Sequence, residues 1–473
     1  MSQTTVTPPA PPTGPTGPTG SPLAGGLKQR HLSMIALGGV IGAGLFVGSG
    51  AGIAAAGPSI VLAYAASGLL VMFVMRMLGE MSAANPASGS FSVHAERAVG
   101  PWAGFTAGWM FWTLLCVGVA IEAIGAAAIM TGWFPGTPSW LWVLLFMAVF
   151  CGSNLAAVSH FGEFEFWFAA LKIAAIGLFL VLGTLAILGL LPGTAAPGTA
   201  NLLHDGGLLP NGVDGLLVGL LASVVAYGGL ETVTIAAAES DDPVRGVAKA
   251  VRTTMWRIAV VYVGSMLVVV TLVPWDSEGV AAGPYAAALD HLGIPGAGQV
   301  MNVVILIALL SAMNANIYGS SRMAYSLVAR GQGPKALGKV SGGVPRRAVL
   351  ASCGFGFVTV LLSYWYPDTL FAWLLNMVGG VILVVWGFVA VSQFVLRRRL
   401  EREAPQKLVV RMWGFPYLTW VALAGVAGVL VLMAWDPDTR VQVVFTGGLT
   451  LALAVTGYVM QRARASTGTG ADA

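Results

Sequence analysis

Three ionisable residues interrupt long apolar stretches of the sequence: Glu122, Lys172 and Glu231. An ionisable group inside a membrane segment is energetically expensive and usually functional. At about 1.5 Å per helical residue, Glu122 lies about 16 Å from Trp133 near one end of its segment, and Lys172 lies about 14 Å from Glu163 near the opposite end. Glu122 and Lys172 are therefore expected near the middle of a bilayer, where they could bind a charged substrate or exchange a proton.

Each of these groups also has a structural interpretation. Glu122 could be a neutral packing carboxyl, Lys172 a tether to the first apolar helix, and Glu231 a cap for backbone N–H groups. Glu163 and Glu165 are expected to be structural, because they begin a helix at the water boundary and acidic groups suit the positive end of a helix.

Two glycine-rich stretches predict breaks in membrane helices. Glycine is a poor helix former, and a break within a membrane is tolerated only where it is buried in protein or lines a cavity. Close helix packing through small residues is the alternative. The central residues are Gly42, Ala43 and Gly44 in the first stretch, and Tyr227, Gly228 and Gly229 in the second.

A polar stripe follows one later apolar segment. Ser311, Asn314, Tyr318 and Arg322 share one helical face, whereas Asn316 points elsewhere. Such a stripe suits either a substrate path, with Ser311 and Asn314 as binding residues, or hydrogen bonds between helices.

Composition places these residues in a membrane protein. The chain has 473 residues, of which 56% are hydrophobic and 9% charged, far fewer charges than the roughly 25% of a soluble domain. A bilayer core takes about 20 apolar residues per helix. The sequence therefore predicts an all-α membrane protein with twelve transmembrane helices, near residues 33–55, 60–80, 101–131, 139–158, 163–191, 214–237, 253–274, 298–329, 347–366, 369–396, 412–435 and 441–461.

Lysine and arginine residues predict the orientation. They concentrate in alternate loops and at both ends of the chain, and only Arg440 falls on the opposite side. Because positive residues favour the cytoplasm, both termini are expected there, in a multi-pass protein of the cytoplasmic membrane. Residues 1–26 should form a disordered tail, and no cleavable signal peptide is expected to precede the first segment.

Several kinds of chemistry lack their motifs. The three cysteines have no paired spacing, no HExxH motif or Cys/His cluster occurs, and no phosphate-binding GxxxxGK[ST] motif is present. We therefore expect no metal, no other cofactor, no ATP-driven pumping and no enzymatic activity. The net charge of +4 gives no reason to expect a nucleic-acid partner, and no obligate protein partner is evident.

The two glycine stretches also divide the chain into halves. The second stretch lies in the sixth segment, which would begin a second five-helix unit of opposite orientation, and interrupted helices at corresponding positions of inverted halves indicate a transporter's binding site. The expected organisation is a first repeat (27–191), an extracellular loop (192–213), a second repeat (214–396), two peripheral helices (397–461) and a cytoplasmic tail (462–473).

Long motifs resemble the bacterial amino acid transporter group of the amino acid–polyamine–organocation superfamily. The resemblance runs from about Leu27 to Arg462. It is carried by Arg30-His31, GVIGAGLF at 39–46, FGEFEFW at 161–167, WRI at 256–258, and Asn314, Tyr318 and SRM at 321–323. Within the group, VTIAAAESD at 233–241 and the segment 411–420 most resemble the 4-aminobutyrate (GABA) permeases.

The resemblance implies a LeuT-like fold of five plus five inverted helices with two peripheral ones. It implies substrate binding by unwound backbone at residues 42–44 and 227–229, although Ala43 replaces the hydroxyl residue common in relatives. Lys172 matches the lysine that stands where sodium-coupled members hold an ion, which favours protons as the coupling ion. Glu122 matches the group's third-helix glutamate, and with Lys172 and Glu231 it forms the expected proton-coupling set.

We therefore expect a secondary permease that imports GABA or a related small amino acid together with protons, by alternating access. Its expected partners are the amino acid, protons and the lipid bilayer. The alternatives are a permease of the same family for an aromatic amino acid, proline or a cationic amino acid, and, from a different class, an amino acid channel or sensor.

Overall fold

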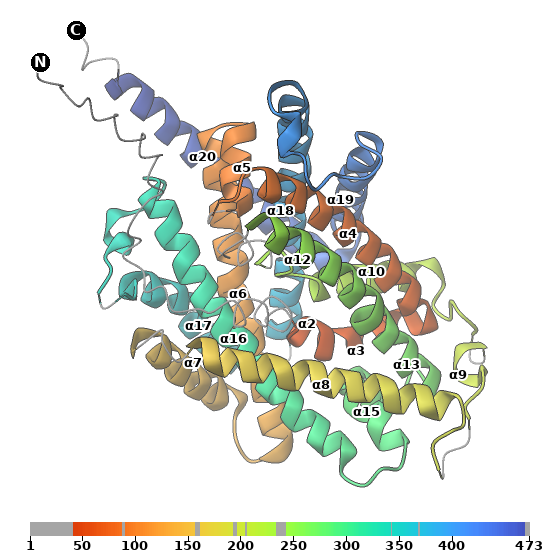
Figure 1. The fold of residues 1–473 in the computed structure, drawn as a ribbon. Coiled ribbons are helices and arrows are strands. Elements are labelled where there is room, and N and C mark those ends of the chain that lie inside the picture. The colour runs from red at the N-terminus through yellow and green to blue at the C-terminus, as the bar shows by residue number, and fades with distance from the viewer. Residues whose placement is uncertain are drawn as a thin grey trace, which may run out of the picture.

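A computed structural model describes residues 41–87, 90–156, 161–192, 196–203, 206–232, 243–341, 343–367 and 369–468. Within these ranges the chain is almost entirely helical, and its β-pairing is confined to an isolated bridge between Ser341 and Val344. The predicted all-α class is therefore confirmed (Figure 1). The expected N-terminal tail and the start of the first span lie outside the described residues.

The first span of the first half is divided into two short helices, because the helix is interrupted at Val47. Proline at the first helical position suits the start of a helix, as at Pro101. In order the elements are α2 (Ala43–Phe46), α3 (Gly48–Ala56), η1 (Gly57–Ser59), α4 (Ile60–Ala84), α5 (Ser90–Ala98), α6 (Pro101–Trp133), α7 (Ser139–Ala156) and α8 (Phe161–Ile187).

The second half also begins with a shortened helix, because α10 ends at Ala226 rather than near the expected residue 237. The elements are α9 (Ala200–Leu203), α10 (Gly212–Ala226), α12 (Pro243–Arg257), the π-helix η2 (Ile258–Val263), α13 (Gly264–Leu272), α14 (Glu278–Ala282), α15 (Pro284–His291), α16 (Ala297–Ala329), η3 (Lys335–Gly338), α17 (Arg346–Trp365), α18 (Leu370–Glu403), η4 (Pro405–Lys407), α19 (Tyr417–Trp435) and α20 (Pro437–Gly468).

Ten helical stretches among the described residues are long and apolar enough to cross a membrane. One of them runs from Ala43 to Ala84 and contains the first two expected spans, and α10 is a shorter apolar helix at the sixth. Each of the twelve expected spans thus corresponds to a helix of the structure.

The long helices α6 and α16 pack extensively against each other. They run in opposite directions, because the end of α6 meets the start of α16 and the start of α6 meets the end of α16. The Trp133 indole donates to Gln299 Oε1 (3.0 Å) at one end of the pair, and the Trp109 indole donates to the Gln332 carbonyl (2.8 Å) at the other. These bonds fix the register of the two helices.

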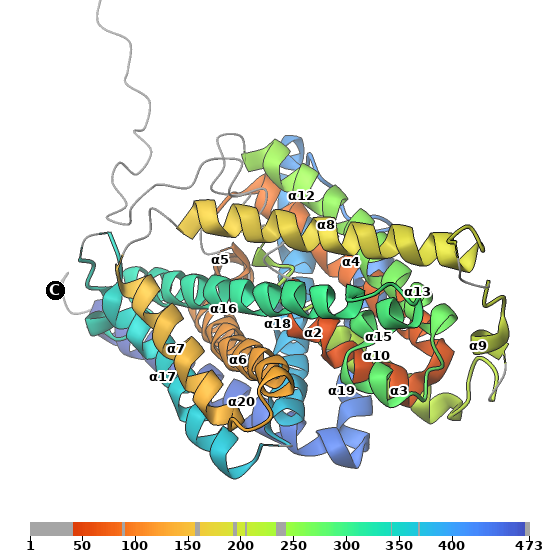
Figure 2. The same cartoon turned by 90° about the horizontal axis from the view of Figure 1, so that it is seen from below.

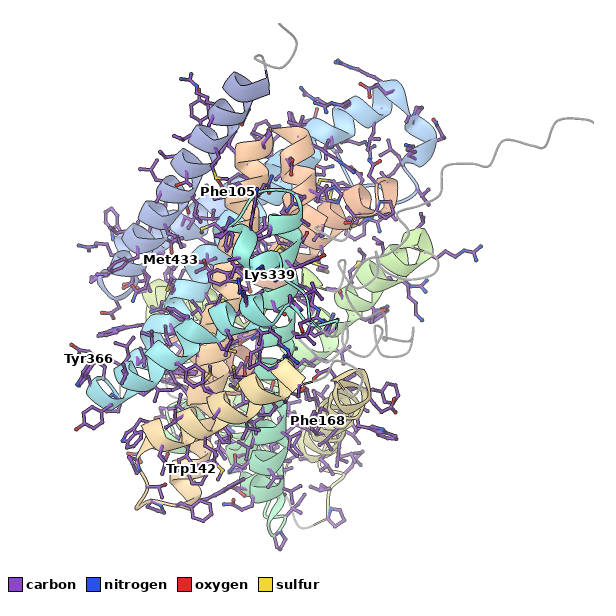
Figure 3. The ribbon with its side chains drawn as sticks, turned by 90° about the vertical axis from the view of Figure 1, so that its left-hand side faces the viewer. Phe105, Trp142, Phe168, Lys339, Tyr366 and Met433 are labelled. Carbon is purple, nitrogen blue, oxygen red and sulfur yellow. The ribbon has the colours of Figure 1, made fainter. Side chains whose placement is uncertain are left out.

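The helices fall into two groups on either side of α18. Figures 1 and 2 place α6, α7, α16 and α17 on one side and α2, α3, α10 and α13 on the other. The outer surface is apolar, with exposed side chains such as Leu178, Leu361 and Val431. Figure 3 shows the Trp142 and Tyr366 rings toward the end of the bundle opposite Phe105. A lipid-facing surface of this kind is typical of membrane helices.

Candidate functional site

The two glycine-rich stretches meet in the middle of the molecule. Gly42 is extended (φ −147°, ψ −151°) and α2 begins directly after it. The second break follows Ala226, where Gly229 adopts a positive φ of 93°. A Cβ atom on Gly44 would lie 2.9 Å from Ala226 Cα, so only glycine permits this approach of the two backbones. The extended backbone lies at Gly42, since Ala43 and Gly44 already belong to α2.

Glu122 lies on α6 directly against the first break. Its carboxylate accepts hydrogen bonds from the Ala43 N–H at 3.2 Å (Oε1) and 3.0 Å (Oε2), and the side chain is 8% exposed. A Cβ atom on Gly42 would overlap the same carboxylate. The first N–H groups of a helix have no acceptor within the helix, and Glu122 supplies one for α2. Glu122 can therefore act as a packing group of the protein while it lies at the first helix break.

Lys172 is fully buried on α8 and interacts electrostatically with both Glu165 and Glu122. Glu165 is also fully buried, and both of its carboxylate oxygens accept from Ser311 Oγ at 2.8 Å. The expectation that Glu165 lies at the water boundary is therefore wrong. Glu165 shares the buried face of α8 with Lys172, seven residues further along, because two turns of helix separate them.

The polar stripe of α16 makes contacts between helices. Ser311 binds Glu165 of α8, and Asn314 Oδ1 accepts from Asn154 Nδ2 of α7 at 2.6 Å. The Arg322 guanidinium lies 3.7 Å from the centre of the Tyr318 ring. The stripe thus makes the interhelical hydrogen bonds that were one of its two interpretations.

A cavity of about 60 Å³ opens where the two breaks meet α6. Its polar side chains are Glu122 and Asn316, and the remainder of its wall is glycine or apolar. Asn316 points away from the stripe, as expected, because it follows Asn314 by two residues and about 200° of helical rotation. The sequence did not predict that this other side of α16 faces the cavity. The full lining is Gly42, Gly44, Leu114, Gly118, Ile121, Glu122, Val225, Ala226, Gly228, Gly229, Asn316, Leu375 and Val378.

Several residues that were expected to bind the substrate lie outside the cavity lining. Ala43, Tyr227, Ser311 and Asn314 do not line the cavity. The Tyr227 hydroxyl donates to the Tyr64 carbonyl of α4 at 2.8 Å. Tyr227 therefore anchors the second break through its side chain.

Glu231 connects the second break to α18. Its side chain is fully buried, and Oε1 accepts a hydrogen bond from the Trp386 indole. Trp386 lies on the same helix as Leu375 and Val378 of the cavity wall. The break, the cavity and α18 are thus in direct contact.

The sequence matches the family model described as amino acid permease over residues 31–465. The chain belongs to the amino acid permease family. The match covers both breaks, Glu122, Lys172 and the residues that line the cavity.

Relatives of this permease differ in the substrates that their names state. It is 44% identical to a gamma-aminobutyric acid permease of Bacillus subtilis, over 93% of this chain and 94% of that protein. It is 47% identical to the aromatic amino acid transport protein AroP of Corynebacterium glutamicum, over 89% and 92% of the two chains. A gamma-aminobutyric acid permease of Escherichia coli is 42% identical, over 93% and 95%. The sequence identities to the two kinds of relative are too similar to indicate which substrate this permease carries.

Proposed function

We propose that this permease imports GABA or a closely related small amino acid across the cytoplasmic membrane together with protons, by alternating access. The observation that carries the proposal is the Glu122 carboxylate bound to the Ala43 N–H where the two helix breaks meet the cavity. Relatives named as GABA permeases, at 44% and 42% identity, support the choice of substrate.

In this proposal the substrate carboxylate binds at residues 42–44. The first N–H groups of α2 point toward it, and the positive end of a helix attracts anions. The substrate ammonium binds the carbonyl groups at the end of α10, around residues 227–229, and the Glu122 carboxyl, protonated when substrate is bound, offers its carbonyl oxygen as a further acceptor. Ser311 and Asn314 support this site from behind, through Glu165 and Asn154.

Glu122 is the proposed proton carrier. As a carboxylate it occupies the Ala43 N–H that a substrate carboxylate would use. A proton on Glu122 removes its charge and weakens this bond, because hydrogen bonds to ionised acceptors are about twice as strong as neutral ones. Proton binding therefore favours substrate binding at the same break.

Lys172 and Glu231 complete the proposed coupling set. Lys172 interacts with Glu122 and Glu165, so a change of charge on Glu122 alters the electrostatic balance of α8. Glu231 is linked to α18 by the hydrogen bond that its carboxylate accepts from the Trp386 indole. We further propose that both termini are cytoplasmic, and that 27–191 and 214–396 are the inverted repeats, with 397–461 peripheral.

Uptake into proteoliposomes tests the proposal. With an inward pH gradient, the purified permease should accumulate radiolabelled GABA, and excess unlabelled GABA should compete. Competition by phenylalanine, proline or arginine alone would contradict the choice of substrate and leave amino acid import standing. Accelerated exchange in counterflow is expected of a carrier, whereas downhill flux without saturation would indicate a channel.

A further inference from the structure

Asn316 presents an amide group to the cavity from the side opposite the polar stripe of α16. It packs on Gly118 of α6, where a Cβ atom would lie only 2.7 Å from Asn316 Nδ2. Gly118 precedes Glu122 by four residues, which is about 6 Å along the helix. The amide thus lies about one helical turn along the cavity from the Glu122 carboxylate.

This amide has no hydrogen-bond partner among the residues that the structure describes, unlike Asn314, which binds Asn154. An asparagine side chain offers two donors and an acceptor with two lone pairs. Asn316 is partly buried and lines the cavity, so an apolar ligand that covered its amide without a hydrogen bond would cost about 1–3 kcal/mol. Leu114, Leu375 and Val378, which line the same cavity, offer no hydrogen-bonding side chain, so a polar group of a ligand in the cavity is a suitable partner for the amide.

We propose that Asn316 is a specificity-determining residue, whose amide binds a polar group at the end of the substrate remote from the carboxylate. This inference rests on the proposed function and deepens it. The preferred substrates are short, unbranched amino acids that end in a hydrogen-bonding group such as an ammonium or an amide. In GABA this group is the ammonium itself, which Asn316 Oδ1 would bind together with the carbonyl groups around residues 227–229 of the same cavity. A substrate with an apolar end leaves the amide unpaired, and sites built around a hydrogen bond reject such analogues strongly.

Selection by a polar group differs from selection by the size of the cavity. The apolar wall and the glycines at 42, 44, 118, 228 and 229 set the available width. They do not distinguish a polar end from an apolar end of equal size. Among the described residues of the lining, only Asn316 and Glu122 have polar side chains that could recognise a polar end. In this structure the Glu122 carboxylate already accepts a hydrogen bond from the Ala43 N–H.

The test compares uptake of four radiolabelled amino acids by the wild-type permease and by Asn316→Leu in proteoliposomes. GABA and glutamine have polar ends, whereas norvaline and phenylalanine have apolar ends. The wild type should prefer the polar pair, and Asn316→Leu should shift the ratio of uptake by at least tenfold toward norvaline. Asn316→Ala, which removes the amide without adding bulk, should shift it in the same direction if the leucine variant folds poorly.

Asn302→Leu is the matched control, since Asn302 is a partly buried asparagine of α16 that does not line the cavity. An unchanged ratio in both Asn316 variants, or an equal shift in Asn302→Leu, would overturn this inference. So would a wild-type preference for norvaline or phenylalanine, although amino acid import would stand. Absence of uptake of any amino acid by the wild type would overturn the proposed function as well.

Discussion

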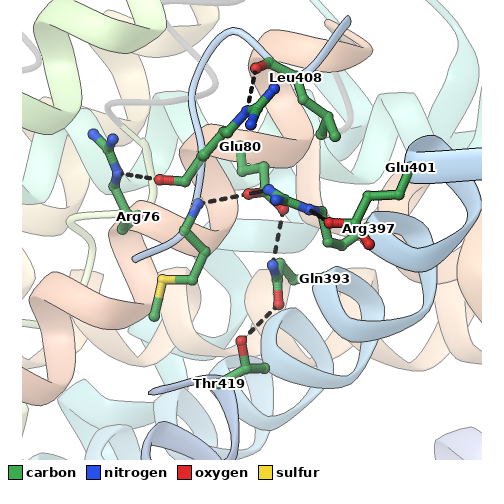
Figure 4. A network of polar contacts seen from close by, with 9 residues as sticks. Arg76, Glu80, Gln393, Arg397, Glu401, Leu408 and Thr419 are labelled. Carbon is green, nitrogen blue, oxygen red and sulfur yellow. Dashed lines mark hydrogen bonds and ion pairs between the residues drawn. The ribbon is translucent and has the colours of Figure 1, made fainter. Parts of the chain in front are cut away.

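Glu80 and Glu122 are both buried carboxylates that accept a backbone N–H group, yet their surroundings differ. Glu80, on α4, accepts from Arg397 Nη1 (2.5 Å), Gln393 Nε2 (2.8 Å) and the Met412 N–H (2.6 Å), as Figure 4 shows. Within the described part of the chain, Glu122 accepts from the Ala43 N–H alone. Glu80 thus accepts hydrogen bonds from three partners, whereas Glu122 has one such partner among the described residues and lines the cavity.

The Glu80 contacts extend through a junction of three segments. Thr419 of α19 donates to Gln393 Oε1 at 2.9 Å, and Arg76 of α4 donates to the Arg411 carbonyl at 2.8 Å (Figure 4). These bonds hold α4, α18 and the connection before α19 together. A charge buried with a complete set of partners stabilises one arrangement of the chain.

The contrast indicates which buried carboxylate is able to change its charge during transport. Neutralising Glu80 would break an ion pair with Arg397, whose side chain is 9% exposed, and leave a buried positive charge. Neutralising Glu122 removes a charge from a site with few partners and frees the Ala43 N–H. We therefore propose that Glu80 stabilises the fold and that Glu122 acts in transport.

Glu80→Ala should have the largest effect on stability. Removing one partner of a buried ion pair costs about 3–5 kcal/mol, so the free energy of unfolding in detergent should fall by this amount. Glu401→Ala is the control, because Glu401 is 44% exposed and also pairs with Arg397, and a pair of that kind contributes about 0–1 kcal/mol. Equal losses in the two variants would contradict the structural role of Glu80.

Gly44→Leu should have the largest effect on transport. The new side chain would collide with Ala226 and separate the two breaks, so GABA uptake should fall about a hundredfold, or about 2.7 kcal/mol in activation free energy. Membrane insertion should persist, measured by the amount of protein in the membrane fraction. Gly132→Leu is the control, because a Cβ atom there meets nothing within 4 Å. Normal uptake by Gly44→Leu would indicate that this glycine serves packing only.

Glu122→Gln should remove coupling while leaving the fold intact. Glutamine cannot exchange the proton, so uptake driven by a pH gradient should fall at least tenfold, about 1.4 kcal/mol. Exchange of labelled for unlabelled GABA without a gradient should persist. Glu163→Gln, in the first turn of α8, should leave both assays unchanged. Full gradient-driven uptake by Glu122→Gln would rule out Glu122 as the proton carrier.

Thr419→Val should have the smallest effect. It removes the outermost hydrogen bond of the Glu80 junction, which should lower the free energy of unfolding by about 1 kcal/mol and leave uptake unchanged. Thr456→Val provides the comparison, because Thr456 is exposed and bonds only within its own helix among the described residues. A loss of uptake in Thr419→Val would show that the junction takes part in transport.

The sequence by itself determined the class of this protein, the positions of its membrane helices and the two breaks. These features are local, because hydropathy fixes the length of a span and glycine clusters weaken a helix wherever they occur. The expected depth of Glu122 and Lys172 in the membrane stays a prediction of the same local kind, since depth is estimated from the distance along a helix.

Only the tertiary structure decided which side of each helix faces the cavity. Helical periodicity separates Asn314 from Asn316 on α16, but it does not say which of the two sides faces the cavity, because protein and lipid are similarly apolar surroundings for a membrane helix. The burial of Glu165 likewise depends on Ser311 of another helix. Glu80 acquires its role from Gln393, Arg397 and Met412, more than 300 residues away along the chain, and such partners are brought together by packing alone.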